Sequence, residues 1–334
     1  MNINRAVEGL RVIEEIVRFV LEDKELTGQL KVIRRKLRQI LENVPFHQRM
    51  ALKDVGRKLY TSGEARRETV QDVFSANAKR VQEAVRVLEE FSKLIRPEFG
   101  RGLKDIRFQL YELEKRIALR IARCQLLDFD LYLVTDPMRD HVAAARKAIA
   151  GGIRAIQLRD ETASKHQLLK WARQMRKLTA KAKVTFIVND HVDIAKAAKA
   201  DGVHLGQADL KKVSIRRARK ELGEDKIIGI SVSDLRQALQ AQKAGADYVS
   251  VWPVFSTPIK PGISPVGLRM LRKVIARVRI PVVAIGGINE RNIDNVLRTG
   301  CARAAVIRAV LGKRDMRKAV RILRKRIFRR TWGS

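Results

Sequence analysis

The chain has 334 residues, 46% of them apolar, which is enough for about two domains with hydrophobic cores. No apolar run approaches the roughly 18 residues that span a bilayer, and the charged, amphipathic residues 1–18 do not have the pattern of a signal peptide. Lysine and arginine total 70 against 36 acidic residues, so the net charge is +34 and anionic partners are favoured. Cys124 and Cys301 show no metal-ligand spacing. We expect reduced thiols, no membrane segment and a cytoplasmic protein.

The positive charge has two interpretations. It is spread along the chain and is densest over residues 313–330, as expected for solvated helix faces. Aromatic residues form only 5% of the chain, so the interleaved aromatic side chains of a single-strand nucleic-acid binder are missing. We therefore favour solvated faces, which also attract phosphorylated small molecules, over a dedicated nucleic-acid partner.

Residues 1–123 carry apolar side chains at helical spacing and contain an internal repeat. The two copies are Asn2-x2-Arg5-x2-Glu8-x2-Arg11-Val12-x-Glu14-Glu15 and Asn77-x2-Arg80-x2-Glu83-x2-Arg86-Val87-x-Glu89-Glu90. The segments that follow them, from Leu30 and from Leu103, also match. The repeat predicts two related helical hairpins packed as a pseudo-twofold four-helix bundle and joined by an irregular connector, residues 43–66.

The repeated polar residues step by three, so they form one slanted stripe of alternating charge on each helix. One interpretation is a solvated ladder of Arg–Glu pairs, each worth a few tenths of a kcal/mol. The other is a polar cleft where the two stripes face each other, because a solvated ladder does not require the same order of residues twice. Both interpretations remain open on the sequence alone.

From residue 128 onward short apolar strands alternate with helical segments. The expected strands are 131–134, 154–158, 184–188, 202–205, 227–230, 247–251, 281–285 and 304–307. The expected helices are 141–150, 164–180, 191–199, 213–222, 234–244, 265–278, 289–299 and 315–327. Eight such units predict a (β/α)8 TIM barrel over 128–330, preceded by an all-α helical-bundle domain over 1–123. A doubly wound sheet is the alternative, but its Gly-x-Gly-x-x-Gly fingerprint is absent from the first turn.

Two aspartates, Asp190 and Asp209, follow consecutive expected strands. Buried carboxylates are costly unless they meet a cation, and Mg²⁺ prefers one or two carboxylates together with phosphate oxygens. Either aspartate alone is more typical of a helix N-cap, but the pair favours a metal site. His204 lies within a strand, where we expect a hydrogen-bonded core histidine and not a ligand.

Cationic side chains and glycines occur at other strand ends. Arg159 and Lys260 offer charge to a diphosphate, Arg159 through its planar fork. Gly286-Gly287 would let backbone N–H groups approach an anion near Arg308, after the last two strands, where barrels commonly bind phosphate. These features predict a phosphorylated, and specifically a pyrophosphorylated, substrate.

At these residues the chain, from 131 to about 325, resembles thiamine phosphate synthase. The matching stretches are Leu131–Asp136, Gln157–Asp160, Val188–Asp190, Ala200–Asp209, Ile228–Ser231, Pro253–Phe255 with Thr257 and Lys260, and Ala284–Ile288. The resemblance implies Mg²⁺-dependent joining of hydroxymethylpyrimidine diphosphate to thiazole phosphate, with release of pyrophosphate. It also implies a pyrimidine-methyl cation, attacked by the thiazole nitrogen without a protein nucleophile.

The resemblance assigns site residues. It implies that Asp190 and Asp209 hold Mg²⁺ and that Arg159, Lys260 and Ser231 are catalytic. The implied pyrimidine diphosphate site is Gln157, Leu158, Arg159, Asp160, Glu161, Asn189, Ser231 and Lys260. The implied thiazole phosphate site is Thr257, Pro258, Ile259, Gly287, Ile307 and Arg308.

Four residues depart from the family pattern. Glu161 stands where lysine is usual, Trp252 replaces glycine, Ile259 replaces threonine and Arg308 replaces serine. An inward-facing Glu161 would weaken diphosphate binding by about 1–3 kcal/mol. These departures leave open another phosphorylated heterocycle, or a weakened barrel that acts as a basic RNA-binding or scaffold protein.

Residues 1 to about 120 resemble the helical domain fused ahead of some thiamine phosphate synthases. The matching residues are Asn4–Ala6, Glu8–Val12, Asp54–Gly56, Ala76–Asn77, Lys79–Ala84 and Arg86–Glu90. This resemblance implies a hydroxymethylpyrimidine phosphate kinase that uses ATP. The sequence shows no Gly-x4-Gly-Lys-Ser/Thr loop, so ATP is expected on the resemblance alone.

Overall fold

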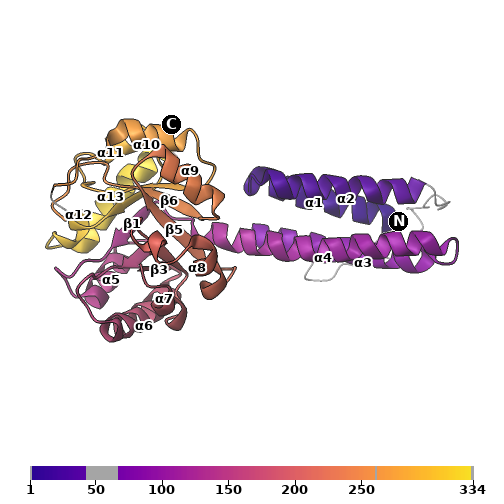
Figure 1. Ribbon diagram of the computed structural model, residues 1–334, viewed down its shortest axis with the longest axis horizontal. Helices are drawn as coiled ribbons and strands as arrows, with labels where there is room; N and C mark the ends of the chain where they lie inside the picture. The colour runs from indigo at the N-terminus through magenta and orange to yellow at the C-terminus, as the bar shows by residue number, and fades with distance from the viewer. Residues whose placement is uncertain (1, 43–66, 260–261, 332–334) are drawn as a thin grey trace. The chain divides into compact units, whose positions relative to one another are not determined.

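The computed structural model describes residues 2–42, 67–259 and 262–331 (Figure 1). The chain divides into two compact units, Met1–Cys124 and Gln125–Ser334. No helix in the described ranges is long and apolar enough to cross a membrane. The expected connector 43–66, with its Asp54-Val55-Gly56 motif, and Lys260 lie outside the described residues.

The described residues of the first unit form four long helices. They are α1 (Asn2–Glu15), which continues into the π-helical turn η1 (Ile16–Val20), α2 (Lys24–Glu42), α3 (Val70–Ser92) and α4 (Pro97–Leu126). Their apolar faces form one core, to which each helix contributes. A capping box between Thr69 and Asp72 fixes the start of α3, since each side chain accepts from the other's backbone N–H. Gly9 lets α1 approach α3 closely: a Cβ there would lie 2.6 Å from Val81 Cγ2.

Each copy of the repeat ends in two glutamates, and the first of the two, Glu14 or Glu89, is buried and paired. Arg34 Nε donates to Glu14 Oε2 at 3.0 Å, and Arg107 Nε donates to Glu89 Oε2 at 2.8 Å. Arg34 and Arg107 occupy matching places after the two copies, so the ion pairs repeat as the sequence does. The other charged members of the stripes are exposed, as the solvated-ladder interpretation expects: Arg5, Glu8, Arg11, Arg80, Glu83 and Arg86.

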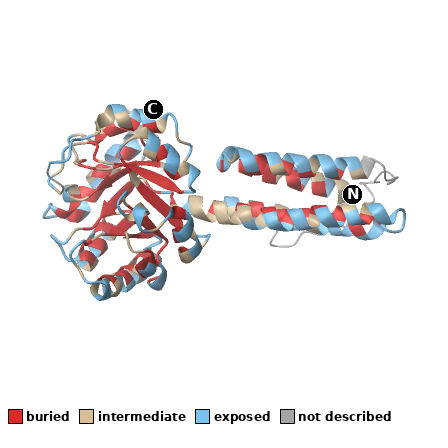
Figure 2. Cartoon of the chain, viewed as in Figure 1, coloured by how far each residue is buried: buried red, intermediate tan, exposed pale blue. Residues whose placement is uncertain are grey.

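The second unit is a closed barrel of eight parallel strands in sequence order, which confirms the predicted TIM barrel. The strands are β1 (Leu131–Val134), β2 (Ala155–Leu158), β3 (Thr185–Asn189), β4 (Gly202–Leu205), β5 (Ile227–Val232), β6 (Tyr248–Val251), β7 (Val282–Ala284) and β8 (Ala304–Val306). Pairing of β1 with β8, for example Leu131 with Ala304, closes the sheet. The strands are buried almost throughout (Figure 2), as expected for a parallel sheet covered by helices.

Helices connect the strands at the expected places. They are α5 (His141–Ala150), α6 (Lys165–Ala182), α7 (Val192–Ala197), α8 (Ile215–Leu222), α9 (Leu235–Lys243), α10 (Gly267–Ile275), α11 (Ile293–Leu297) and α13 (Met316–Thr331). Side chains of Asp140, Ser164, Ser214 and Asp234 cap four of them by accepting from backbone N–H groups. The single turns η3 (Asp209–Lys211) and α12 (Arg308–Leu311) were not predicted, because segments so short carry no periodicity.

Candidate active site

A cavity of about 620 Å³ opens at the carboxyl ends of the barrel strands. Most residues that the sequence assigned to substrate or metal line it. These are Gln157, Arg159, Glu161, Asn189, Asp190, Asp209, Ser231, Thr257, Pro258, Ile259, Gly287, Ile307 and Arg308. The parallel barrel explains this convergence, since the residue after each strand reaches the same face.

Asp190 and Asp209 meet at one side of this cavity. Asn189 Nδ2 donates to Asp190 Oδ2 at 2.6 Å, and the backbone N–H of Gly206 donates to Asp209 Oδ2 at 3.1 Å. Asp190 has a left-handed backbone with φ of 61°, an uncommon conformation that asparagine and aspartate tolerate best. Asp190 does not cap α7, because His191 holds that position. The helix-cap alternative is therefore wrong for Asp190.

The aspartate pair lacks sufficient compensating charge. Burial, the hydrogen bond that protonated Asp190 donates to Asp209, and the charge of Asp209 raise the pKa of Asp190 to about 7, although Arg159 opposes the shift. The two carboxyl groups resist simultaneous ionisation, and their oxygens are the ligands that a hard cation such as Mg²⁺ prefers. Within the described ranges no group of three or more His, Cys, Asp or Glu side chains is placed to hold a metal, so a bound ion would keep open positions for substrate or water.

Arg159 lies between two carboxylates at the cavity. Its Nη2 is 2.5 Å from Glu161 Oε1, and its Nη1 is 3.8 Å from Asp136 Oδ2. Glu161 is half exposed, lines the cavity and adds to the raised pKa of Asp190. The departure at this position therefore places an anion beside the arginine that is expected to bind diphosphate.

Leu158 and Asp160, both assigned to the pyrimidine diphosphate site, do not line the cavity. Leu158 is buried in the core between sheet and helices. Asp160 is buried too, and its Oδ2 is 3.1 Å from His141 Nε2. His141 Nδ1 in turn lies 2.8 Å from Thr135 Oγ1, which accepts from the backbone N–H of Arg159 at 3.2 Å. Asp160 thus stabilises the segment that carries Arg159, through His141 and Thr135 on the side away from the cavity.

The opposite side of the cavity is built on the double glycine. Gly286 and Gly287 have φ of 102° and 65°, and a Cβ on Gly287 would lie 2.4 Å from Ser256 O. The turn therefore requires glycine for its backbone and for its contact with the 256–259 loop. Asn289 and Asn292 hold it by donating to Gly287 O at 3.1 and 3.0 Å.

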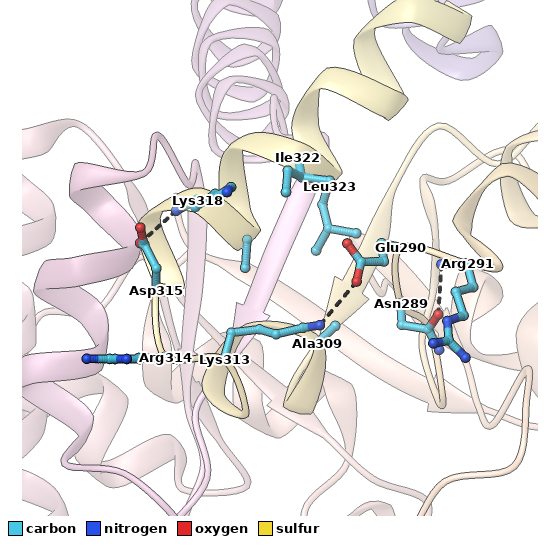
Figure 3. A pocket seen from close by; sticks show the side chains of 11 residues that line it. Asn289, Glu290, Arg291, Ala309, Lys313, Arg314, Asp315, Lys318, Ile322 and Leu323 are labelled. Carbon is cyan, nitrogen blue, oxygen red and sulfur yellow. Dashed lines mark hydrogen bonds and ion pairs between the residues drawn. The ribbon is translucent and has the colours of Figure 1, made fainter.

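Arg308 and Lys313 add positive charge to this side. Arg308 is exposed and begins α12, directly after β8. Lys313, which sequence reasoning missed, also lines the cavity and pairs with Glu290 at 3.1 Å. Figure 3 shows Lys313 extended toward Glu290 in an adjoining pocket of about 410 Å³. In the sequence, only the position of Lys313 after the last strand indicated that it could reach the cavity.

Ser231 and His204 connect the cavity to the barrel interior. His204 Nε2 is 2.9 Å from Ser231 Oγ, and its Nδ1 is 3.0 Å from Tyr248 Oη. His204 is buried with both ring nitrogens hydrogen-bonded, as expected for a core histidine, and burial lowers its pKa to about 4. Gly229 makes room for the Tyr248 ring, because a Cβ there would lie 2.0 Å from Tyr248 Cζ.

The fold and the cavity together define a class of protein: a parallel-barrel enzyme that acts on phosphorylated small molecules. A carboxylate pair and Arg159 stand at one side, and a glycine turn with two cations stands at the other. Both groups lie at the carboxyl ends of the strands, where barrel enzymes carry their active sites.

Comparison with known proteins gives the family. Residues 131–310 match the family model described as thiamine monophosphate synthase, and residues 1–116 match the ThiD2 family. A thiamine-phosphate synthase from Synechocystis is 39% identical over 93% of this chain and 90% of its own length. One from Thermosynechococcus vestitus is also 39% identical, over 98% of this chain and 93% of its own. The structure of thiamine phosphate pyrophosphorylase from Pyrococcus furiosus is 41% identical, covers 63% of this chain and 98% of that one, and gives a TM-score of 0.57.

The chain belongs to the thiamine-phosphate synthase family and is therefore a transferase of thiamine biosynthesis. The match confirms the resemblance over the barrel. For the first unit the ThiD2 match supports the resemblance to the fused helical domain, and the kinase activity stays a prediction.

Proposed function

We propose that the barrel joins 4-amino-2-methyl-5-hydroxymethylpyrimidine diphosphate to thiazole phosphate and releases thiamine phosphate and pyrophosphate. The observation that carries this proposal is the meeting of Asp190, Asp209 and Arg159 at one side of the cavity, opposite the glycine turn and Arg308. Two separate anion-binding regions suit two phosphorylated substrates bound together.

The diphosphate binds at the side of the aspartate pair. Arg159 contacts its oxygens through a planar fork, and Lys260 has the same role on the resemblance. Asn189 holds Asp190 and itself accepts from Gln157 Nε2 at 3.2 Å, which fixes the carboxylate. Mg²⁺ fits the oxygens of Asp190 and Asp209 and, when bound, neutralises charge on the departing pyrophosphate.

The thiazole phosphate binds at the glycine side. The backbone of Gly287 and of residues 257–259 approaches the anion, and Arg308 supplies charge where the family usually has serine. The two substrates are held so that the bond between the pyrimidine methylene carbon and pyrophosphate breaks first, and the thiazole nitrogen then attacks the resulting cation. Catalysis then consists of positioning and charge stabilisation, with no protein nucleophile.

Binding of a divalent ion to the pair is expected to depend on pH. Because the pKa of Asp190 is raised to about 7, the site is protonated below that pH and binds the ion less tightly. At pH 5.5 the affinity should fall about 30-fold relative to pH 8. Titration with Mn²⁺, followed by electron paramagnetic resonance, measures both affinities. Equal affinity at the two pH values would show that Asp190 does not take part.

The same shift predicts how stability changes with pH. The folded-state pKa of Asp190 lies above its ordinary value of 3.8. Its contribution to stability is therefore fully present below about pH 4 and is lost as the pH rises through about 7. A divalent ion should restore stability above pH 7, where the pair is ionised.

Removing the charge of Glu161 is expected to improve substrate binding. In Glu161→Gln, Arg159 loses a competing partner and the diphosphate loses a repelling neighbour, so KM for the pyrimidine diphosphate should fall about three- to tenfold. Steady-state kinetics at saturating thiazole phosphate measure this. Asp128→Asn is the matched control, since Asp128 pairs with Arg154 at 2.7 Å away from the cavity. A higher KM in Glu161→Gln would mean that Glu161 assists binding.

We also propose that the first unit phosphorylates hydroxymethylpyrimidine phosphate with ATP and so makes the diphosphate that the barrel consumes. The match of residues 1–116 to the ThiD2 family supports this proposal. The exposed charged stripes on α1 and α3 offer both signs of charge to an anionic substrate and its counterion.

A coupled assay tests both activities. The full chain is incubated with Mg²⁺, thiazole phosphate and either the pyrimidine monophosphate plus ATP or the pyrimidine diphosphate. Thiamine phosphate from both mixtures supports both proposals, and product from the diphosphate alone removes the kinase. No product from either, together with salt-sensitive RNA binding, would favour the RNA-binding or scaffold alternative.

A further inference from the structure

A chain of four hydrogen-bonded side chains runs through the interior of the barrel to the cavity. Tyr132 Oη lies 3.3 Å from Tyr248 Oη, which lies 3.0 Å from His204 Nδ1. His204 Nε2 lies 2.9 Å from Ser231 Oγ. The two tyrosines are fully buried, whereas Ser231 is half-buried and lines the cavity. The chain therefore has a closed inner end and an open outer end.

The closed end determines the direction of the hydrogen bonds. Among the residues that the structure describes, Tyr132 Oη is hydrogen-bonded to Tyr248 alone. A buried hydroxyl proton without an acceptor is unfavourable, so Tyr132 donates to Tyr248 Oη. Tyr248 has one proton, which it then donates to His204 Nδ1. A neutral imidazole that accepts at Nδ1 carries its proton on Nε2 and donates it to Ser231 Oγ.

The protonation states agree with this order. Burial raises the pKa of Tyr132 and of Tyr248, so both keep their protons near neutral pH. Burial also lowers the pKa of His204, which keeps the ring neutral. If the hydrogen bonds ran in the opposite direction, the proton of Tyr132 would have no acceptor. Ser231 would then donate its proton to His204 and not into the cavity.

We propose that this chain of hydrogen bonds leaves the Ser231 hydroxyl free to donate into the cavity. Ser231 then selects a substrate atom that carries a lone pair, and this atom is a ring nitrogen of the pyrimidine. Tyr132, Tyr248 and His204 are positioning residues that set the polarity of Ser231. The inference rests on the proposed function, because it takes the pyrimidine as the ligand beside Ser231.

The first test reads the tautomer of His204 directly. Nuclear magnetic resonance of the full chain, with isotope-labelled imidazole nitrogens, distinguishes a proton on Nε2 from one on Nδ1. The signal of His204 is assigned by its loss in His204→Gln. We expect the Nε2–H form in the wild-type protein without ligand. The Nδ1–H form would overturn the proposed direction.

The second test measures substrate selection. Binding of the pyrimidine diphosphate is compared by calorimetry with that of two analogues in which one ring nitrogen is replaced by C–H, all without thiazole phosphate. One analogue should bind the wild type about tenfold more weakly. Ser231→Ala should bind that analogue and the parent compound equally well. If Ser231→Ala still binds that analogue more weakly than the parent compound, by the same factor as the wild type, the proposed role of Ser231 is overturned.

The tyrosines provide a third readout. Tyr248→Phe should raise KM for the pyrimidine diphosphate about five- to tenfold and leave kcat within about twofold. Tyr132→Phe should change KM less, because Tyr248 can still donate to His204 Nδ1. Tyr111→Phe, a change at an exposed position of α4, is the control and should leave KM unchanged. Unchanged KM in Tyr248→Phe would contradict the proposal. If no pyrimidine compound binds, the proposed function fails. If the pyrimidine compounds bind normally but His204 carries its proton on Nδ1, only the proposed hydrogen-bond order is overturned.

Discussion

Asp190→Asn is expected to abolish Mg²⁺-dependent synthesis of thiamine phosphate and to lower kcat/KM about 10³-fold. The substitution removes one of the two negative oxygens that fit the ion and keeps the side chain's size. Asparagine also tolerates the left-handed backbone of residue 190, where φ is 61°. Alanine would add backbone strain, so asparagine gives the cleaner test.

The variant should lose activity without losing stability. In the folded chain without metal, Asp190 is partly buried beside Asp209, and its raised pKa shows that the ionised form is disfavoured. A neutral amide removes that repulsion, so the unfolding midpoint above pH 7 should be unchanged or higher. Sites that sacrifice stability for function behave in this way.

Initial rates with both substrates across a range of Mg²⁺ concentrations provide the measurement. Asp193→Asn is the matched control, because Asp193 makes an exposed pair with Lys165 at 2.7 Å outside the cavity. Asp209→Asn should match Asp190→Asn, and the double variant should be little worse than either, since both residues serve one ion. More than a tenth of wild-type activity in Asp190→Asn would contradict the proposed metal site.

Much of the barrel and its site could be predicted from the sequence because the parallel barrel converts sequence position into spatial position. A residue just after a strand reaches the active face, which is how Asp190 and Gly287 were found. Alternation along β2 and the residues just after it also matters: Gln157, Arg159 and Glu161 line the cavity, whereas Leu158 and Asp160 do not. The resemblance assigned the whole run, and the period of two along the strand would have separated the two sets.

Other features depend on contacts that the sequence does not show. Tyr132 and Tyr248 meet across the barrel although 116 residues separate them, so neither was connected with Ser231. Turns as short as α12 carry no pattern, so the start of a helix at Arg308 was missed. In the first unit the repeat indicated a charged stripe, but only packing decides that Glu14 and Glu89 are buried and the others exposed.

That burial leads to the second large effect, on stability. Arg107→Ala should destabilise the first unit by about 1–3 kcal/mol, because the carboxylate of Glu89, only 2% exposed, then keeps only the half-exposed Arg86 at 2.9 Å as its partner. Arg34→Ala should have a similar effect, since Arg34 pairs with Glu14, whose side chain is only 7% exposed. Replacing the whole pair, as in Glu89→Leu with Arg107→Met, should recover most of the loss, because no buried charge then remains.

Hydrogen exchange measured by mass spectrometry on peptides from α3 and α4 reports the free energy of opening within the first unit of the full chain. Arg116→Ala is the control, since its pair with Glu25 at 2.8 Å is exposed and should contribute less than about 1 kcal/mol. If Arg107→Ala accelerates exchange no more than Arg116→Ala, the buried pairs do not stabilise the unit. The repetition of Glu14 and Glu89 would then have to be explained by function, and the polar-cleft interpretation would regain its support.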